Sequence, residues 1–315
     1  MQILKFGGSS LADATSIRHV AQLVREYARG NETIVVCSAC AGVTDRLIRI
    51  ASLIAAGNTS EALAETRAVR CHHHQILAAI SPDSAATDGN ENASGAPHGL
   101  EELDSFLLAL VNGMSHAEVT PLWTDAVLSY GERTSVRLVA QAIRNDGTDA
   151  VAVDATDCIV TNDNFGDAKP LLKETRQRCR ETLLPLLSRG VIPVVTGFIG
   201  ATLDGEITTL GRNSSDFSAA IIGHAMDAHE VWLWTNVDGV FSRDPAKQNG
   251  HGGDFTFFDE LSYDDALRLA EGGAKVLHPK TIHPLKEKNI ALRIRNTFRP
   301  AHSGTRIGPR RKKPQ

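Results

Sequence analysis

The sequence predicts an α/β protein, a three-layer αβα sandwich around a mainly parallel open sheet. Two observations lead to this prediction. Short apolar runs rich in β-branched residues recur along the chain, and segments with apolar residues at helical spacing separate them. The runs are apolar on both faces, as in strands that helices cover on both sides. The expected strands are residues 3–6, 33–37, 150–153, 191–195 and 230–234.

Helices are expected between these strands. Residues 17–27 have apolar side chains at helical spacing, and Gly30 ends that segment. Further helical segments are expected from about residue 48 to 80, from 100 to 119, and from Phe217 onward. The Ser-, Asp-, Asn- and Gly-rich residues 81–99 predict a flexible surface loop between two helices, and residues 309–315 a solvated basic tail.

Composition excludes several classes of protein. The 315 residues are 42% hydrophobic and 22% charged, with a net charge of −4, which excludes a disordered chain and a strongly basic nucleic-acid binder. No apolar run approaches the roughly 20 residues of a membrane span. The five scattered cysteines do not suggest a disulfide framework. We expect a cytoplasmic protein without nucleic-acid or membrane partners.

The loop after the first strand has the chemistry of an anion site. Lys5 stands at the strand tip, and Gly7, Gly8 and Ser9 follow it. Glycines let backbone N–H groups approach an anion closely, and the next helix N-terminus adds its dipole. The lysine precedes the glycines, so this is not the P-loop pattern. A plain strand-to-helix turn remains the alternative.

Three later loops carry further candidate residues. The loop 208–216 contains Arg212, whose planar fork suits a carboxylate or phosphate. It also contains Asp216, which could orient a lysine or a metal, or simply cap a helix. The loop 234–245 follows a buried strand, and the loop 272–279 carries Lys275. Taken singly, these loops could be ordinary turns.

Two patterns that suggest metal or redox chemistry are not expected to provide it. His72, His73 and His74 are consecutive, so on a helix at most two of them could share one ion. Cys37 and Cys40 have C-x-x-C spacing, but the resemblance described next gives Ser38 between them a substrate role. No metal site is therefore predicted from protein residues.

Together, the motifs in this order resemble the aspartate kinases of the amino acid kinase superfamily. The resemblance covers nearly the whole chain and rests on several motifs in fixed order. They are Lys-Phe-Gly-Gly-Ser-Ser at 5–10, residues 38–44, Tyr-Gly-Glu-Arg-Thr-Ser at 130–135, residues 161–166, Gly-Phe-Ile-Gly at 197–200, the loops 208–216 and 234–245, Gly-Ala-Lys-Val-Leu-His-Pro at 273–279, residues 295–298, and Gly304-Thr305.

The resemblance implies ATP-dependent phosphorylation of the β-carboxylate of L-aspartate, with Mg²⁺, by a homodimer. It implies one domain over 1–308, with an amino-acid lobe (1–190) and a nucleotide lobe (191–308). By resemblance, Lys5 neutralises the transferring phosphoryl group and Asp216 organises the active-site lysines. The implied aspartate-binding residues are Ser38, Thr44, Glu132, Arg212 and Ser215. The implied nucleotide-binding residues are Lys5, Gly7, Gly8, Ser9, Thr235, Asn236, Phe241, Asp244, Lys275 and Val276.

The chain departs from the family pattern in length and at several residues. Thr156 stands near where an arginine is common, Asn236 replaces a frequent aspartate, and Phe241 replaces a tyrosine. Ser214 stands where aspartate kinases usually have glycine, and it would be strained if that position needs a positive φ. Most members continue into small-molecule-sensing domains, whereas this sequence ends at Gln315, so we expect no inhibition by lysine or threonine. The alternatives are a kinase for another amino acid carboxylate and a catalytically silent homologue that binds nucleotide or amino acid.

Overall fold

The computed structural model describes residues 1–81, 99–114, 118–242, 256–271 and 278–309. The expected residues Asp244, Lys275 and Val276 lie outside these ranges, as do residues 82–98 and 310–315. Within them, no helix is long and apolar enough to cross a bilayer.

The centre of the molecule is one eight-stranded sheet in the order β10-β12-β11-β7-β1-β2-β4-β3. Neighbouring strands are parallel except β11 and β12, so the sheet is mainly parallel as predicted. Its strands are β1 (Gln2–Phe6), β2 (Thr33–Cys37), β3 (Ala150–Val153), β4 (Ile192–Thr196), β7 (Glu230–Thr235), β10 (Glu260–Ser262), β11 (Ala291–Asn296) and β12 (Thr305–Gly308). Two small antiparallel pairs lie outside it: β5 (Ile199–Ala201) with β6 (Ile207–Thr209), and β8 (Val240–Phe241) with β9 (Phe257–Phe258).

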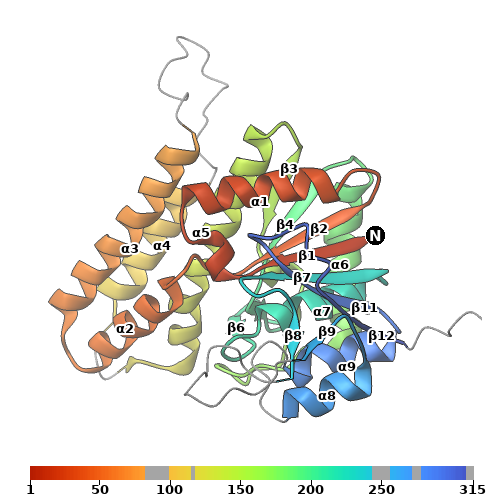
Figure 1. Cartoon of the computed structure of the whole chain (residues 1–315). Helices are drawn as coiled ribbons and strands as arrows, with labels where there is room; N and C mark the ends of the chain where they lie inside the picture. The colour runs from red at the N-terminus through yellow and green to blue at the C-terminus, as the bar shows by residue number, and fades with distance from the viewer. Residues whose placement is uncertain (82–98, 115–117, 243–255, 272–277, 310–315) are drawn as a thin grey trace, which may run out of the picture.

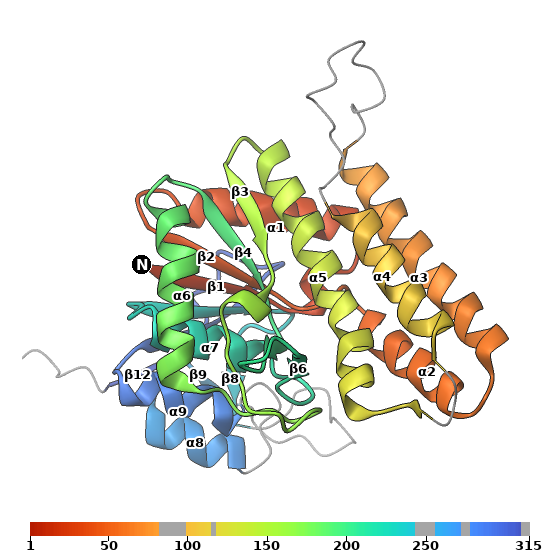
Figure 2. The same cartoon turned by 180° about the vertical axis from the view of Figure 1, so that it is seen from behind.

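Helices cover both faces of the sheet and complete the three layers (Figures 1 and 2). One face carries α1 (Ala14–Tyr27) and α5 (Pro121–Asn145), and the other carries α6 (Leu172–Leu187), α7 (Ser215–Ala225) and α9 (Pro279–Glu287), with α8 (Tyr263–Glu271) beside α9. A helical lobe of α2 (Val43–Ala55), α3 (Thr59–Ile80) and α4 (Leu100–Asn112) packs on α5 at one side of the molecule.

The structure confirms the expected strands to within a residue at each end and divides some of the expected helices. The helical region 48–80 is two helices, α2 and α3, separated at Gly57, which has a φ of 79°. The expected helix 100–119 is too long, because α4 ends at Asn112 and α5 begins anew at Pro121. The Thr120 side chain caps α5 by accepting a hydrogen bond from the Trp123 amide, and Pro121 suits a first helical position.

The topology brings the candidate loops to one edge of the sheet. The strands β1, β2, β4 and β7 are parallel neighbours, so the loops after Phe6, Cys37, Thr196 and Thr235 meet at their carboxyl ends. The chain runs outward from β1 to β2 through α1 on one face, and from β7 to β11 through α8 and α9 on the other. Ligands of open α/β sheets bind at such a reversal of strand order.

Candidate active site

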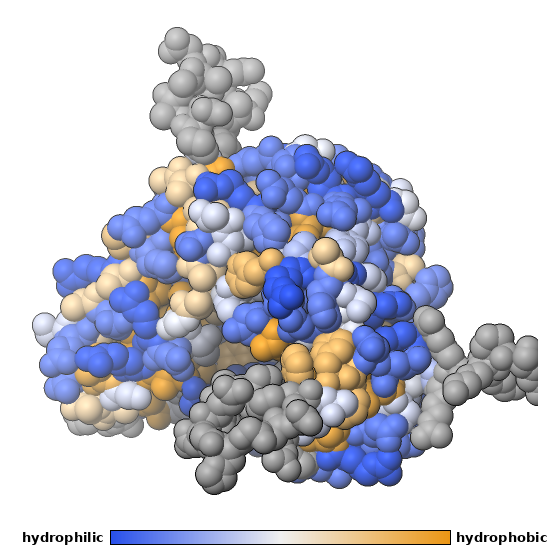
Figure 3. Space-filling model, in the orientation of Figure 1, coloured by the Kyte–Doolittle hydropathy of each residue, from blue (hydrophilic) through white to orange (hydrophobic). Residues whose placement is uncertain are grey.

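A pocket of about 490 Å³ opens at the carboxyl ends of the central strands, between the sheet and the helical lobe. The space-filling view shows the surface hollowed between the lobe at the left and the sheet-bearing body at the right (Figure 3). The pocket brings together all the predicted aspartate-binding residues and both predicted catalytic residues. Its lining is Lys5, Gly7, Gly8, Ser9, Ser38, Ala39, Cys40, Ala41, Gly42, Thr44, Asp45, Ile48, Leu128, Glu132, Phe198, Arg212, Asn213, Ser214, Ser215 and Asp216.

Lys5 and Asp216 form an ion pair at the inner end of the pocket. Lys5 lies in β1 between Val36 of β2 and Leu233 of β7, and it is only 8% exposed. Its Nζ lies 2.5 Å from an Asp216 carboxylate oxygen in the first turn of α7. Asp216 is therefore not the helix cap considered above; Ser214 occupies the N-cap position. The pair is consistent with an aspartate that orients the lysine ammonium.

The glycine loop approaches its neighbours closely. The Gly7 amide donates a hydrogen bond to the carbonyl of Trp234 in β7, over 3.3 Å. A Cβ on Gly8 would lie 3.0 Å from the Ala39 carbonyl oxygen, so a side chain there would press against the loop after β2. Gly7 lies near the lysine head as well, since a Cβ on it would be 3.6 Å from Lys5 Nζ. The loop thus places backbone directly beside the ammonium group.

Glu132 is a buried carboxyl group with one unsatisfied oxygen. It comes from α5, is 3% exposed, and its Oε2 has no hydrogen-bond partner among the described residues. Burial raises its pKa to about 8, although the Ala39 amide and the charge of Lys5 act in the opposite direction. The preceding Gly131 allows this approach, because a Cβ there would lie 2.9 Å from Ala39 Cβ. Such a carboxyl group is suited to receive a cationic ligand.

Arg212 lies at the mouth of the pocket. Its guanidinium donates to a carboxylate oxygen of Asp45, in the first turn of α2, over 3.2 Å. Both side chains are more than 70% exposed, so the guanidinium remains accessible to a ligand. The contact joins the loop before α7 to the helical lobe. Asp45 is a pocket residue that the sequence patterns did not single out.

In the loop 208–216 the non-glycine residue with a positive φ is Asn213, and not Ser214 as considered from sequence. Ser214 has a φ of −93°, an ordinary conformation, so the strain that a positive φ would impose on it does not arise. Asn213 has the positive φ, 60°, and asparagine tolerates this region better than most residues. Ser215 packs tightly against the loop after β4, where a Cβ on Gly197 would lie 2.7 Å from Ser215 Cβ.

Three of the expected nucleotide-binding residues, Thr235, Asn236 and Phe241, are described by the structure but do not line the pocket. Thr235 ends β7, and its carbonyl accepts a hydrogen bond from the Thr297 amide. Asn236 follows it, and Phe241 in β8 packs edge-on against Phe257 at 5.3 Å between ring centroids. Because β7 pairs with β1, Thr235 and Asn236 follow the strand next to the one that carries the glycine loop, whereas Phe241 lies in the separate β8–β9 pair. Their contact with nucleotide remains a prediction.

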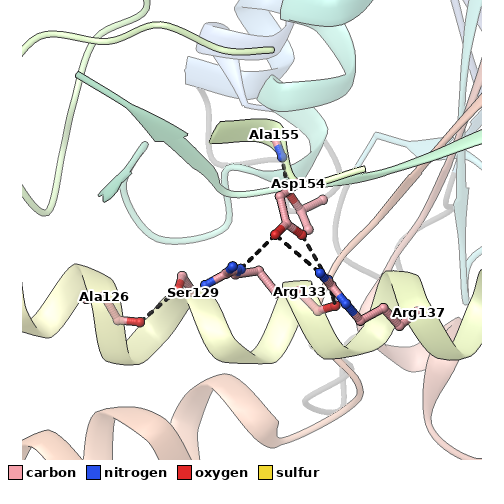
Figure 4. Close-up of polar contacts among 7 residues, drawn as sticks. Ala126, Ser129, Arg133, Arg137, Asp154 and Ala155 are labelled. Atoms are coloured by element: carbon pink, nitrogen blue, oxygen red, sulfur yellow. Dashed lines mark hydrogen bonds and ion pairs between the residues drawn. The ribbon is translucent and has the colours of Figure 1, made fainter. Parts of the chain in front are cut away.

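Two carboxylates, buried Asp125 and partly buried Asp154, support the site from outside and were missed by the sequence patterns. Asp125 accepts hydrogen bonds from the Thr209 amide and hydroxyl and from the Gly166 amide, each over 2.8 Å, which joins α5 to β6. Asp154, after β3, accepts 2.9 Å hydrogen bonds from Arg133 and Arg137 of α5 (Figure 4). These contacts hold α5, which carries Glu132, against the sheet. Only the fold reveals their partners.

The histidine and cysteine patterns take structural positions. His73 is fully buried, which lowers its pKa to about 3, and His74 hydrogen bonds to Asp104 at 2.7 Å. Burial raises the pKa of the Cys40 thiol to about 12, and Cys37 is also buried. Among the described residues no group of three or more acidic, His or Cys side chains could hold a metal ion.

The fold and the pocket agree with comparisons to known proteins. Residues 1–296 match the model of the amino acid kinase family. The chain therefore belongs to the amino acid kinase family.

Relatives within this family are aspartokinases. The chain is 31% identical to lysine-sensitive aspartokinase 3 of Escherichia coli over 305 residues and 33% identical to the chloroplastic aspartokinase 3 of Arabidopsis thaliana over 308. Each match covers 97% of this chain, and 63% and 52% of those relatives. The crystal structure of E. coli aspartokinase III in complex with aspartate and ADP superposes with a TM-score of 0.85 at 29% identity, covering 100% of this chain and 66% of that one.

Proposed function

We propose that the protein transfers the γ-phosphoryl group of ATP to the β-carboxylate of L-aspartate, giving 4-phospho-L-aspartate and ADP. One observation carries the proposal. A single pocket is lined by the Lys5–Asp216 pair, which lies next to the glycine loop, by the buried carboxyl group of Glu132 with its unpartnered oxygen, and by the accessible Arg212. The first pair suits a phosphoryl group, and the other two residues suit the ammonium and carboxylate of an α-amino acid. The aspartokinase relatives support aspartate as that amino acid.

At the amino-acid side, Glu132 receives the substrate ammonium and Arg212 its α-carboxylate. Ser38, Thr44 and Ser215 add hydroxyl groups around the same space. The division proposed from sequence assigns residues 1–190 to the amino acid and 191–308 to the nucleotide. Arg212 and Ser215 come from the second part but belong to the amino-acid side of the pocket.

At the nucleotide side, the chain provides positioning and charge rather than acid–base chemistry. A carboxylate is already nucleophilic at neutral pH, so no general base is needed. Lys5 neutralises charge on the transferring group, and Gly7, Gly8 and Ser9 lie where backbone and hydroxyl groups can contact phosphate oxygens. Thr235, Asn236 and Phe241 extend toward the remainder of the nucleotide, with Asp244, Lys275 and Val276 proposed to complete its site.

Mg²⁺ is proposed to enter bound to the phosphates of ATP. Mg²⁺ is commonly held by substrate phosphates and only one or two carboxylates, and Asp216 is a partly exposed carboxylate beside Lys5 in the pocket. When bound, the ion withdraws charge from the phosphate oxygens. Lys5 and Asp216 then orient the phosphoryl group toward the acceptor side.

A hydroxamate assay with ATP, Mg²⁺ and L-aspartate tests the proposed function. Hydroxylamine traps the acyl phosphate as aspartyl hydroxamate, and we expect product that depends on both substrates. Product with a different amino acid only would indicate a related carboxylate kinase. Tight nucleotide binding without any product would indicate a silent homologue, and either result would contradict the proposal.

Two further properties are proposed for the 315-residue polypeptide. We expect its aspartate-dependent activity to be unchanged by millimolar lysine or threonine in the same assay, and inhibition by either would contradict this. We expect it to form a homodimer, which light scattering of the purified polypeptide would measure.

Replacing Asp45 by asparagine should improve the use of aspartate. Asp45 competes with the substrate α-carboxylate for Arg212 and repels an anionic substrate at the mouth of the pocket. Exposed ion pairs contribute about 0.2–1 kcal/mol, so we expect the KM for aspartate to fall about two- to fivefold in Asp45→Asn, at unchanged kcat. Steady-state kinetics measure it. Asp264→Asn removes the exposed ion pair with Lys286 and serves as control; a higher KM in Asp45→Asn would refute the competition.

A further inference from the structure

The hydroxyl group of Ser214 is buried in the pocket and has no partner. The residue is 5% exposed, and its Oγ makes no hydrogen bond within the described part of the chain. It occupies the N-cap position of α7, where a serine hydroxyl ordinarily accepts a hydrogen bond from an amide of the first turn, but no such bond is present. Its backbone carbonyl does accept from the Ser218 amide, over 2.8 Å. The side chain is thus not used for capping.

Buried hydroxyl groups without partners are uncommon, because leaving one unsatisfied costs about 1–3 kcal/mol. Ser214 adopts an ordinary φ of −93°, so the position does not require a special side chain for its backbone. A smaller residue would fit the same backbone without an unsatisfied group. The arrangement is accounted for if a ligand supplies the missing partner.

The surroundings of Ser214 indicate an anionic partner. Ser214 precedes the first turn of α7, an 11-residue helix, whose amide groups and dipole favour negative charge. Two residues further on, Asp216 holds the ammonium of Lys5. Ser214, Lys5 and Asp216 all line the same pocket.

We propose that the Ser214 hydroxyl donates a hydrogen bond to a γ-phosphoryl oxygen of ATP. This inference rests on the proposed function. The amino-acid groups have other partners in that function, Glu132 for the ammonium and Arg212 for the α-carboxylate. Ser214 lies between Arg212 and Asp216 in the chain, on the side of the loop that leads to the Lys5 ammonium.

The contact strengthens as the phosphoryl group moves. The bond between the γ-phosphorus and the β,γ-bridging oxygen breaks, ADP leaves with that electron pair, and an aspartate carboxylate oxygen forms the new bond to phosphorus. Ser214 keeps its proton throughout and contributes only a hydrogen bond to a non-bridging oxygen. A preorganised donor stabilises the negative charge on that oxygen in the transition state.

The test compares nucleotides that differ in the γ-phosphoryl group. Titration calorimetry with Mg²⁺ gives the dissociation constants of the β,γ-imido analogue of ATP and of ADP for the wild type, Ser214→Ala and Ser214→Thr. We expect Ser214→Ala to weaken the analogue about tenfold relative to ADP, because a hydrogen bond to a charged group contributes roughly 1.5–3 kcal/mol. Ser214→Thr, which keeps the hydroxyl, should restore most of the preference. Ser52→Ala, an exposed serine of α2, is the control.

Thermal unfolding separates this role from a structural one. Removing an unsatisfied buried hydroxyl should leave the midpoint of Ser214→Ala equal to or above that of the wild type. A lowered midpoint with equal loss of analogue and ADP binding would overturn the inference. A Ser214→Ala variant that keeps the wild-type preference for the ATP analogue over ADP would also overturn the inference, even if its KM for aspartate rises.

The hydroxamate assay on the same proteins keeps the two proposals apart. A wild type that forms aspartyl hydroxamate, with an unchanged nucleotide preference in Ser214→Ala, refutes the role of Ser214 alone. A wild type that forms none, with the preference lost in Ser214→Ala, refutes aspartate phosphorylation alone. Absence of nucleotide binding by the wild type refutes both.

Discussion

Replacing Lys5 by methionine should lower kcat at least about a hundredfold, because it removes the buried cation that we propose faces the transferring phosphoryl group. Methionine matches the length of the aliphatic stem and fills the same space between β2 and β7. Asp216 would lose its ammonium partner but remains about one third exposed, so the fold should tolerate the change. Steady-state hydroxamate kinetics measure the effect, and circular dichroism confirms the fold.

Matched variants separate the charge of Lys5 from the loss of an ion pair. Lys286→Met breaks an exposed ion pair with Asp264, away from the pocket lining, and should retain wild-type turnover. Asp216→Asn retains the Lys5 ammonium but removes its carboxylate partner, so it should reduce kcat less than Lys5→Met. Near-normal turnover in Lys5→Met would refute the assignment of the phosphoryl site.

The use of aspartate should depend on pH through Glu132. Burial raises the pKa of this carboxyl group to about 8, so in the free protein it is mostly protonated at neutral pH. In the proposed site its ionised form receives the substrate ammonium, hence kcat/KM for aspartate should rise as pH increases toward about 8. At higher pH the substrate ammonium itself loses its proton and the profile turns down. The bell-shaped profile is the expected result.

Glu132→Gln should raise the KM for aspartate about 10- to 100-fold, since a hydrogen bond to a charged group contributes about 1.5–3 kcal/mol. It should also abolish the ascending limb of the pH profile. Glu230→Gln, which breaks the ion pair with Arg293 outside the pocket lining, is the matched control. A Glu132→Gln variant with an unchanged KM and an unchanged ascending limb would remove Glu132 from the substrate site.

Unfolding experiments test the raised pKa of Glu132 without depending on activity. The folded pKa of about 8 lies above the reference value of 4.5, so the native state holds an additional proton between these values. The free energy of unfolding that Glu132 contributes is therefore fully present below about pH 4.5 and is lost as pH rises through 8. Denaturant titrations of Glu132→Gln should lack this decrease. The same decrease in both proteins would contradict a raised pKa.

Local sequence was sufficient for the five expected strands, which became β1 to β4 and β7, and for the loops that carry the site. It did not indicate β5, β6 or β8 to β12, three of which complete the central sheet. A parallel strand buried on both faces is a continuous apolar run, as in Thr33–Cys37, and its glycine-containing end is visible in the residues that follow. Helix ends were predicted less well. Gly57 divides the expected helical region 48–80, and α4 ends at Asn112, well before the Thr120 side chain caps the start of α5.

The sequence alone indicated the residue types of the site: a lysine before glycines, an arginine and an aspartate in one loop, and a glutamate on a helix. Their order along the chain also indicated the family. What required the tertiary structure was every property that arises between distant segments. The Lys5–Asp216 pair, the contact of Arg212 with Asp45, the raised pKa of Glu132 and the unpartnered Ser214 hydroxyl are of this kind. Distance, burial and hydrogen-bond satisfaction are set by how segments pack, and residues 211 positions apart in the sequence meet only after the sheet has formed.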